Sequence, residues 1–69
     1  MSVYKVIDII GTSRTSWEEA AAEAVRTARQ TIRDLRVAEV VKQDIHLEED
    51  GGITYRSRLQ ISFKYESES

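Results

Sequence analysis

The chain of 69 residues contains neither cysteine nor proline and has only three glycines. Without cysteine, the fold cannot be held by disulfides, and thiolate metal sites and cysteine nucleophiles are excluded. A domain of this size buries only about 60% of the surface of its unfolded chain, so its own core is small unless subunits associate. We therefore expect a single domain, residues 1–69, that associates with further copies of itself.

Long apolar segments and an excess of positive charge are also missing. No apolar run approaches the roughly 20 residues needed to cross a bilayer, and the start, MSVYKVIDII, has no basic region and no small-residue cleavage site of a secretory signal. The 10 basic and 12 acidic residues give a formal net charge of -2, which disfavours nucleic-acid binding driven by counterion release. We expect a cytoplasmic protein with neither a membrane nor a nucleic-acid partner.

Catalytic motifs are absent as well. His46 is the single histidine, and the chain has no Gly-x-Ser-x-Gly elbow and no glycine-rich phosphate loop. A lone histidine in a strand is usually structural or exposed, although it can also sense pH or bind a metal. The sequence therefore indicates a protein that is not an enzyme.

The pattern of apolar residues predicts a strand followed by a helix. The segment SVYKVIDII is rich in β-formers on both faces, and GTSRTS indicates a turn before a helix over residues 17–35. Ser16 with Glu19 has the spacing of a capping box, and so has Thr15 with Glu18. The apolar stripe of the helix, at steps of three and four, consists of Trp17, Ala21, Ala24, Val25, Ala28, Ile32 and Leu35.

Two further strands follow the helix and form a hairpin. RVAEVVKQDIHLE and ITYRSRLQISFKYE flank EDGG, in which residues 50–51 or 51–52 fit a two-residue turn. If the helix makes the first two strands parallel, placing the third between them makes every neighbouring pair antiparallel and the crossover right-handed. The expected fold class is α+β, a β-α-β-β subunit whose three-stranded antiparallel sheet partly wraps one helix.

The predicted hairpin is too long for one helix to cover. Arms of about 13 residues extend roughly 43 Å at ~3.3 Å per residue, whereas a helix of about 19 residues spans about 28 Å. The uncovered ends of the hairpin should therefore be buried by neighbouring copies, together with the apolar start of the second strand. The residues of that start are Val37, Ala38, Val40 and Val41.

Charged and aromatic residues of the helix offer a second candidate surface. Four arginines at spacings of three, four and three would line one side of it: Arg26, Arg29, Arg33 and Arg36. Such a stripe could bind an anion, but the net negative charge favours a solvated face that pairs with acids of another subunit. Trp17 is in phase with the apolar stripe, so we expect it in the core or at an interface rather than as a stacking platform.

An acidic face on the second strand is the candidate ion site. Asp44, His46 and Glu48 follow at steps of two, so their side chains start roughly 6.6 Å apart on one face. Calcium needs six to eight oxygen ligands at about 2.3 to 2.6 Å, so a site here requires a second strand, water or symmetry-related copies. From the spacing alone, a solvated surface that pairs with basic residues such as Arg56 across the hairpin is favoured.

Over essentially its whole length, the sequence resembles the dodecin family. The similarity lies in VYKVIDIIGTS, in the helical segment WEEAAAEAVRTAR, and in RVAEV leading into a hairpin that ends ISFKYE. The resemblance implies a hollow shell of twelve β-α-β-β subunits that binds small ligands without catalysis. Many members of the family bind flavins, such as riboflavin or FMN, at subunit interfaces.

The positions of the family's flavin site carry other residues in this chain. Flavin-binding members have a tryptophan just after the helix, which stacks on the isoalloxazine ring, and a glutamine nineteen residues later that hydrogen-bonds to it. This chain has Val37 and Arg56 at those positions. Valine has no π face, so a stacking contribution of about 0.5 to 1.5 kcal/mol is lost, and arginine lacks the acceptor that glutamine supplies.

These departures, with MSVYKVIDIIGTS and QDI, make the chain more similar to the branch known as calcium dodecins. The resemblance implies a homododecamer that binds calcium in place of a flavin. Because calcium takes hard oxygen donors, the candidate ligands are Asp44, Gln43 and Glu48, with symmetry or water completing the shell. The alternatives are flavin storage in a non-standard site, and a structural or protein-interaction shell that uses the arginines.

Overall fold

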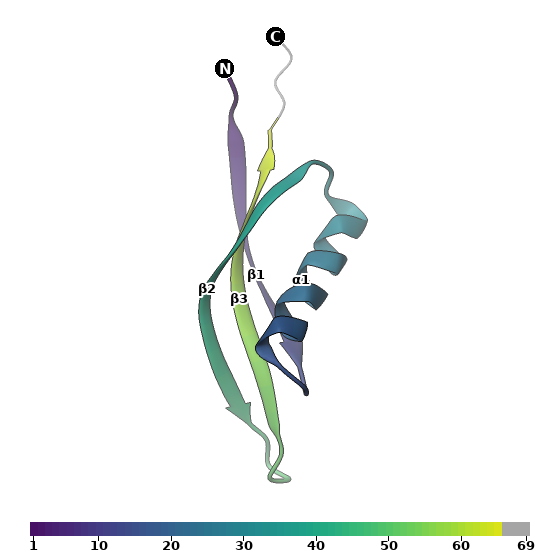
Figure 1. The fold of residues 1–69 in the computed structure, drawn as a ribbon, viewed down its shortest axis with the longest axis vertical. Helices are drawn as coiled ribbons and strands as arrows, with labels where there is room; N and C mark the ends of the chain where they lie inside the picture. The colour runs from purple at the N-terminus through teal and green to yellow at the C-terminus, as the bar shows by residue number, and fades with distance from the viewer. Residues whose placement is uncertain (66–69) are drawn as a thin grey trace.

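The computed structural model describes residues 1–65 and has one helix beside a three-stranded sheet (Figure 1). The elements are β1 (Tyr4–Ser13), α1 (Trp17–Thr31), β2 (Leu35–Leu47) and β3 (Ile53–Lys64). β3 lies between β1 and β2 and pairs antiparallel with both. The β-α-β-β order, the central position of β3 and the helix on one side of the sheet confirm the predicted fold.

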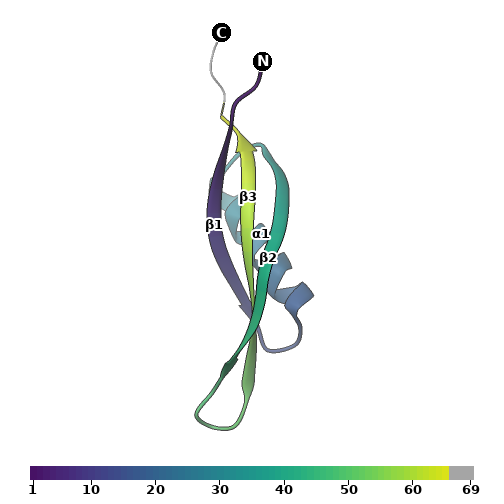
Figure 2. The ribbon, with the colours of Figure 1, turned by 90° about the vertical axis from the view of Figure 1, so that its left-hand side faces the viewer.

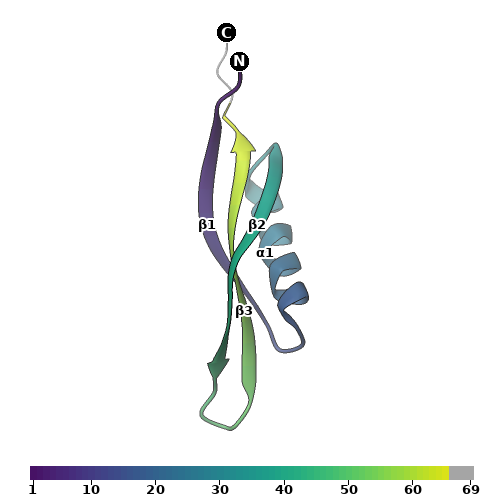
Figure 3. The ribbon, with the colours of Figure 1, turned by 60° about the vertical axis from the view of Figure 1, so that its left-hand side comes forward.

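The sheet is long, narrow and twisted. Figures 2 and 3 show the hairpin of β2 and β3 crossing the helix and continuing past the start of α1. The 15 residues of α1 span roughly 22 Å, whereas the 13 residues of β2 extend roughly 43 Å. The far end of the hairpin therefore has no helix over it within one chain. Within residues 1–65, no helix is long and apolar enough to span a bilayer.

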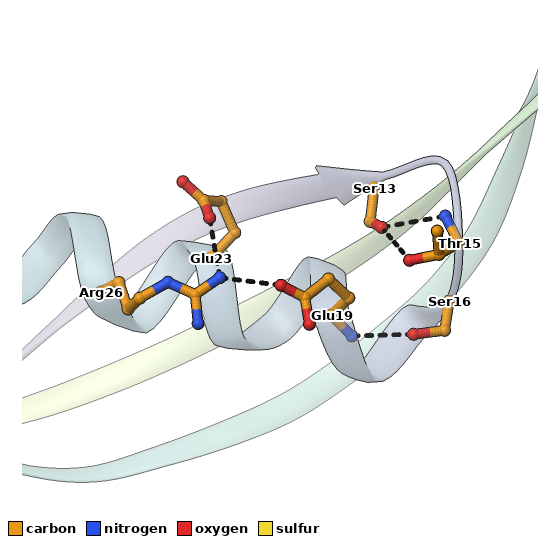
Figure 4. A network of polar contacts seen from close by, with 6 residues as sticks. All are labelled: Ser13, Thr15, Ser16, Glu19, Glu23 and Arg26. Atoms are coloured by element: carbon orange, nitrogen blue, oxygen red, sulfur yellow. Dashed lines mark hydrogen bonds and ion pairs between the residues drawn. The ribbon is translucent and has the colours of Figure 1, made fainter.

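The start of the helix confirms one of the two predicted caps. Ser16 is the N-cap, and its hydroxyl oxygen accepts a hydrogen bond of 3.0 Å from the N–H of Glu19. The carboxylate of Glu19 pairs with Arg26 at 2.8 Å, and Arg26 also pairs with Glu23 at 2.9 Å (Figure 4). Arg26 is thus bound by carboxylates of its own helix.

The helix ends at Thr31, four residues before the predicted end at Leu35. The N–H of Ile32 still donates to the carbonyl of Ala28 at 2.9 Å, but the backbone of Ile32 is extended. Asp34 then has a left-handed φ of 62°, which asparagine and aspartate tolerate better than most residues. This turn places Leu35 on β2, where it packs against the core. Core packing thus outweighs the helical period over the last four predicted residues.

The predicted arginine stripe is wrong for the same reason. Arg26 and Arg29 lie on α1, whereas Arg33 lies in the turn after the helix and Arg36 lies on β2. Spacings of three and four align side chains only while the backbone stays helical. Arg29 and Arg36 instead line one groove where the helix gives way to the sheet.

The core lies between α1 and β3 and is small. Its buried apolar residues are Ala20, Ala24, Ala28, Leu59 and Ile61. Of the predicted stripe, Ala24 and Ala28 are buried and Ala21 flanks the core, whereas Ala20 is buried without having been predicted. Alanine side chains let the helix lie close to the sheet. Gly11 on β1 does the same, because a Cβ there would lie 2.0 Å from the carbonyl oxygen of Ala20.

The hairpin turn lies at the predicted position, but its loop is longer than the predicted two residues. The N–H of Glu48 donates to the carbonyl of Gly52 at 2.9 Å, and the N–H of Gly51 donates to the carbonyl of Glu48 at 3.1 Å. Gly51 has the positive φ, 93°, that glycine adopts readily. The loop therefore has three residues, 49–51, and the predicted two-residue turn is wrong. Three-residue loops of this kind end in a left-handed residue, here a glycine.

A large share of the apolar side chains is exposed. No residue of β2 is buried. The exposed apolar residues of the three strands are Tyr4, Val6, Ile10, Val37, Val40, Val41, Ile45, Leu47 and Ile53. Exposed apolar surface of this extent is typical of a subunit that associates with others.

Candidate ligand site on the outer face of the sheet

The two faces of the sheet differ in character. On β3, Leu59 and Ile61 are buried against α1, and we call this side the inner face. Residues alternate along a strand, so Arg56 and Arg58 lie on the opposite, outer face. Residues paired across antiparallel strands share a face, and the register pairs Asp44 with Arg56. Asp44 therefore also lies on the outer face.

A β-bulge at Val41 determines which residues of β2 reach this face. Val40 pairs with Leu59 on the inner face, but the next pair joins Lys42 to Arg58 on the outer face. One extra residue inverts the faces of all residues that follow it in the strand. The bulge thus brings Lys42 and Asp44 to the outer face.

Asp44 and Arg56 form a bidentate ion pair there. The Nε of Arg56 donates to one carboxylate oxygen at 2.7 Å, and its Nη2 donates to the other at 2.9 Å. The hydrogen bonds from Arg56 are the main cause that lowers the pKa of Asp44 below its ordinary value, with the charges of Arg56, Lys42 and His46 acting in the same direction. Asp44 is therefore ionised at neutral pH. The pair confirms the predicted pairing across the hairpin.

The inner face holds the backbone at Asp44 in place. The indole Nε1 of Trp17 donates to the carbonyl oxygen of Asp44 at 3.1 Å. The Trp17 ring packs edge to face on Tyr55, with the ring centroids 5.1 Å apart. Ser57 adds a hydrogen bond of 2.9 Å from its hydroxyl to the carbonyl of Trp17. Trp17 is thus half-buried and structural in this chain, as its phase predicted.

A second ion pair lies next to the first. The guanidinium of Arg58 donates to both carboxylate oxygens of Asp8 on β1, at 3.0 and 3.3 Å, and this lowers the pKa of Asp8. Between the two pairs is a pocket of about 60 Å³, lined by Ile10, Lys42, Asp44, Arg56 and Arg58. The outer face therefore presents alternating charges around a small hollow.

The three predicted calcium ligands do not converge within one chain. The register places Gln43 on the inner face and Asp44 on the outer face. Glu48 lies four residues further along, where its carboxylate accepts a hydrogen bond of 2.6 Å from Thr54 and lies 3.8 Å from the Nε2 of His46. Within residues 1–65, no three histidine or acidic side chains gather closely enough to hold a metal ion. An ion site built on these residues needs further ligands, from water or from other copies.

The two positions of the family's flavin site are also apart within one chain. Val37 pairs with Ser62 on the outer face, six residues along β3 from Arg56. At ~3.3 Å per residue this is about 20 Å. Val37 is 61% exposed. A single ligand could contact both positions only if they came from different copies.

Comparison with known proteins identifies the family. A family model described as Dodecin matches residues 3–66. This chain belongs to the dodecin family. It is 64% identical to a protein named calcium dodecin from Mycobacterium tuberculosis over 64 residues, which are 93% of this chain and 90% of that protein. We therefore describe the chain as a small ligand-binding protein of the dodecin family.

Solved dodecin structures have the same fold. The structure of a calcium dodecin from Mycobacterium tuberculosis, described as calcium chelating and as having a calcium-binding site, has a TM-score of 0.87 at 59% identity over 99% of this chain and 97% of that chain. A protein from Thermus thermophilus has a TM-score of 0.88 at 32% identity, over 99% of this chain and 100% of that chain. A dodecin from Streptomyces davaonensis has a TM-score of 0.86 at 26% identity, over 96% of this chain and 97% of that chain.

Two features of the site were not predicted from the sequence. The bulge at Val41 leaves no local signal, because a run of β-branched residues fits either face of a strand. The pair of Asp8 and Arg58 did have a signal, since Asp8 is the one acid in the first predicted strand and arginines lie on the strand expected beside it. Opposite charges on neighbouring strands tend to pair.

Proposed function

We propose that this dodecin forms a hollow shell of twelve copies that binds calcium, without catalysis, at contacts between the copies. The observation that carries the proposal is the 64% identity with a calcium dodecin over 93% of this chain. The exposed apolar side chains of β2 and of the hairpin support assembly, because burial between copies removes them from water.

Asp44, Gln43 and Glu48 are the oxygen donors that we assign to calcium. One chain offers too few of them in one place, and calcium takes six to eight oxygens. Contacts about a symmetry axis repeat each carboxylate, so a few donors per copy can complete the shell. The bidentate bond to Arg56 leaves further lone pairs on the carboxylate of Asp44 for an ion. The positive charge of Arg56 opposes the ion, and acids of neighbouring copies offset it.

Calcium is favoured over a flavin by the residues on the outer face. Val37 has no aromatic face on which an isoalloxazine ring could stack. Two of the five N–H donors of Arg56 are bonded to Asp44, and arginine has no acceptor to offer a flavin ring. Flavin storage remains the alternative, and it requires a mode of binding without the stacking residue. A purely structural shell is the second alternative, and it requires no small ligand.

Isothermal titration calorimetry of chelator-treated protein tests the proposal. We expect saturable calcium binding by the wild type and its loss in Asp44→Asn. Asp8→Asn is the matched control, because Asp8 also pairs with an arginine on the outer face but is not a proposed ligand. Absence of calcium heat at millimolar concentration in an intact dodecamer would contradict the proposal. Quenching of riboflavin or FMN fluorescence by the same sample would favour the flavin alternative.

A further inference from the structure

The loop between β2 and β3 contains the one Asp-Gly step of the chain, Asp50–Gly51. In such a step the backbone nitrogen of the second residue can attack the carboxyl carbon of the aspartate, because glycine has no Cβ to hinder the approach. Both residues are exposed, and a Cβ built on Gly51 would meet nothing within 4 Å. Neighbouring groups therefore do not crowd this step.

The loop also folds the side chain of Asp50 toward the attacking nitrogen. The N–H of Gly52 donates to Oδ1 of Asp50 at 2.9 Å, and a bond to the second residue along curls the side chain over the peptide between them. The same N–H donates to an oxygen on which negative charge develops when the carboxyl carbon is attacked. One contact opposes the attack, since the N–H of Gly51 donates to the carbonyl of Glu48 at 3.1 Å. Releasing one such bond slows the step by at most about tenfold.

We propose that Asp50 is a site of spontaneous isomerisation to isoaspartate in the folded protein. The nitrogen of Gly51 forms a bond to Cγ of Asp50 in its acid form, and the hydroxyl of that carboxyl leaves with the amide proton as water. Water then adds to the α-carbonyl carbon of Asp50 in the succinimide ring and breaks the bond from that carbon to the nitrogen. The chain now continues through Cγ, and the former backbone carbonyl is a free carboxylate. Water is the one co-reactant, and the mass of the protein is unchanged.

The other three aspartates of the chain lack this combination. Asp8 and Asp44 are followed by isoleucine, and Asp34 is followed by leucine, so a bulky side chain adjoins the nitrogen that would have to attack. Asp8 and Asp44 also lie on strands, where an arginine binds both carboxylate oxygens of each. We therefore expect the modification at Asp50 and not at these three positions.

Isomerisation should loosen the end of the hairpin. The new linkage adds one carbon to the backbone of a short loop that two hydrogen bonds close, one from the N–H of Glu48 to Gly52 and one from the N–H of Gly51 to Glu48. The amides beside the loop should then exchange with solvent faster, whereas those of β3 beside the core should not change. The modification depends neither on the proposed shell nor on calcium.

Storage of the folded protein at neutral pH and physiological temperature, followed by peptide mapping, tests the proposal. Trypsin releases residues 43–56 as one peptide, which contains both Asp44 and Asp50. Electron-transfer fragmentation shows which of the two carries the isoaspartyl linkage. We expect isoaspartate to accumulate at Asp50 over weeks, at no less than about one tenth of its rate in guanidinium chloride.

Two variants separate the loop chemistry from background. In Gly51→Ala the rate should fall about tenfold, because the new Cβ hinders the approach of the nitrogen. Asp50→Glu is the matched control, since it keeps the charge but would have to close a larger ring, so the peptide should show only the background at Asp44. Circular dichroism shows that both variants keep their fold.

Three results would overturn the inference. They are conversion in the folded protein that is more than about tenfold slower than in guanidinium chloride, equal conversion at Asp44 and Asp50, and an unchanged rate in Gly51→Ala. None of these results bears on calcium binding or on the number of subunits.

Discussion

The guanidinium of Arg56 binds both carboxylate oxygens of Asp44, at distances of 2.7 and 2.9 Å. The pair lies on the outer face of the β2–β3 hairpin, and on the inner face Trp17 binds the carbonyl oxygen of the same aspartate. Asp44 is thus fixed from both sides of the sheet. Its carboxylate is ionised and oriented without a bound metal ion, but the guanidinium of Arg56 already neutralises its charge.

Removing that competing cation should strengthen calcium binding. In Arg56→Gln, Asp44 keeps its charge and loses its partner, so we expect the calcium affinity to rise by roughly three- to tenfold. Calorimetry measures the change. Arg58→Gln is the control, because it releases Asp8 and leaves the pair at Asp44 intact. Equal affinities in the wild type and Arg56→Gln would show that Asp44 is not a ligand.

The ion pair also determines the response to acid. The folded-state pKa of Asp44 is lowered, so the pair stabilises the fold above the ordinary aspartate pKa of about 3.9, and this contribution is lost as the pH falls through the lowered value. Calcium binding should therefore stay level from neutral pH down to roughly pH 5, because protons compete only below that. Titration of the Asp44 carboxyl carbon by NMR measures the pKa, which should rise in Arg56→Gln. An unchanged pKa in that variant would contradict the assigned cause.

Restoring the two flavin positions should create flavin binding. The variant with Val37→Trp and Arg56→Gln regains an aromatic face and an amide acceptor, so we expect it to quench riboflavin fluorescence in the assembled protein. Val37→Leu with Arg56→Gln is the control, since leucine cannot stack on the ring. Quenching by the wild type to the same extent would show that the present residues already bind flavin.

The close contact of β1 with α1 should not tolerate a methyl group. In Gly11→Ala, the new Cβ would meet the carbonyl oxygen of Ala20 at 2.0 Å and the Cβ of Ala24 at 2.9 Å. We expect a loss of about 1–3 kcal/mol in the free energy of unfolding. Gly51→Ala has open space around it and only a positive φ to oppose it, so its cost should be closer to 1 kcal/mol. Urea unfolding at one fixed protein concentration compares the two, and an equal loss would contradict the crowding at Gly11.

The sequence predicted those parts of the fold that depend on local pattern. The alternation along β3 and the cap at Ser16 identified the elements, and the hairpin with its crossover fixed the strand order. The end of the helix was wrong, because it depends on where Leu35 packs and no glycine or proline marks it. Tertiary packing, which the local sequence pattern does not reveal, determined the conformation of residues 32–35.

The candidate site was predictable to a smaller extent. Facing positions in the hairpin were enough to suggest that Asp44 pairs with Arg56. The period of two also implied that Gln43 and Asp44 face opposite sides, so one chain cannot direct both at one ion. The bond from Trp17 to the carbonyl of Asp44 depends on the position of the helix relative to β2, which no sequence spacing gives.

Native mass spectrometry of the purified protein with and without added calcium tests the central claim most directly. The expected result is a species of twelve subunits that gains calcium, and an Asp44→Asn variant that keeps twelve subunits and gains none. A monomer, or a dodecamer that takes up no calcium at millimolar concentration, would contradict the claim.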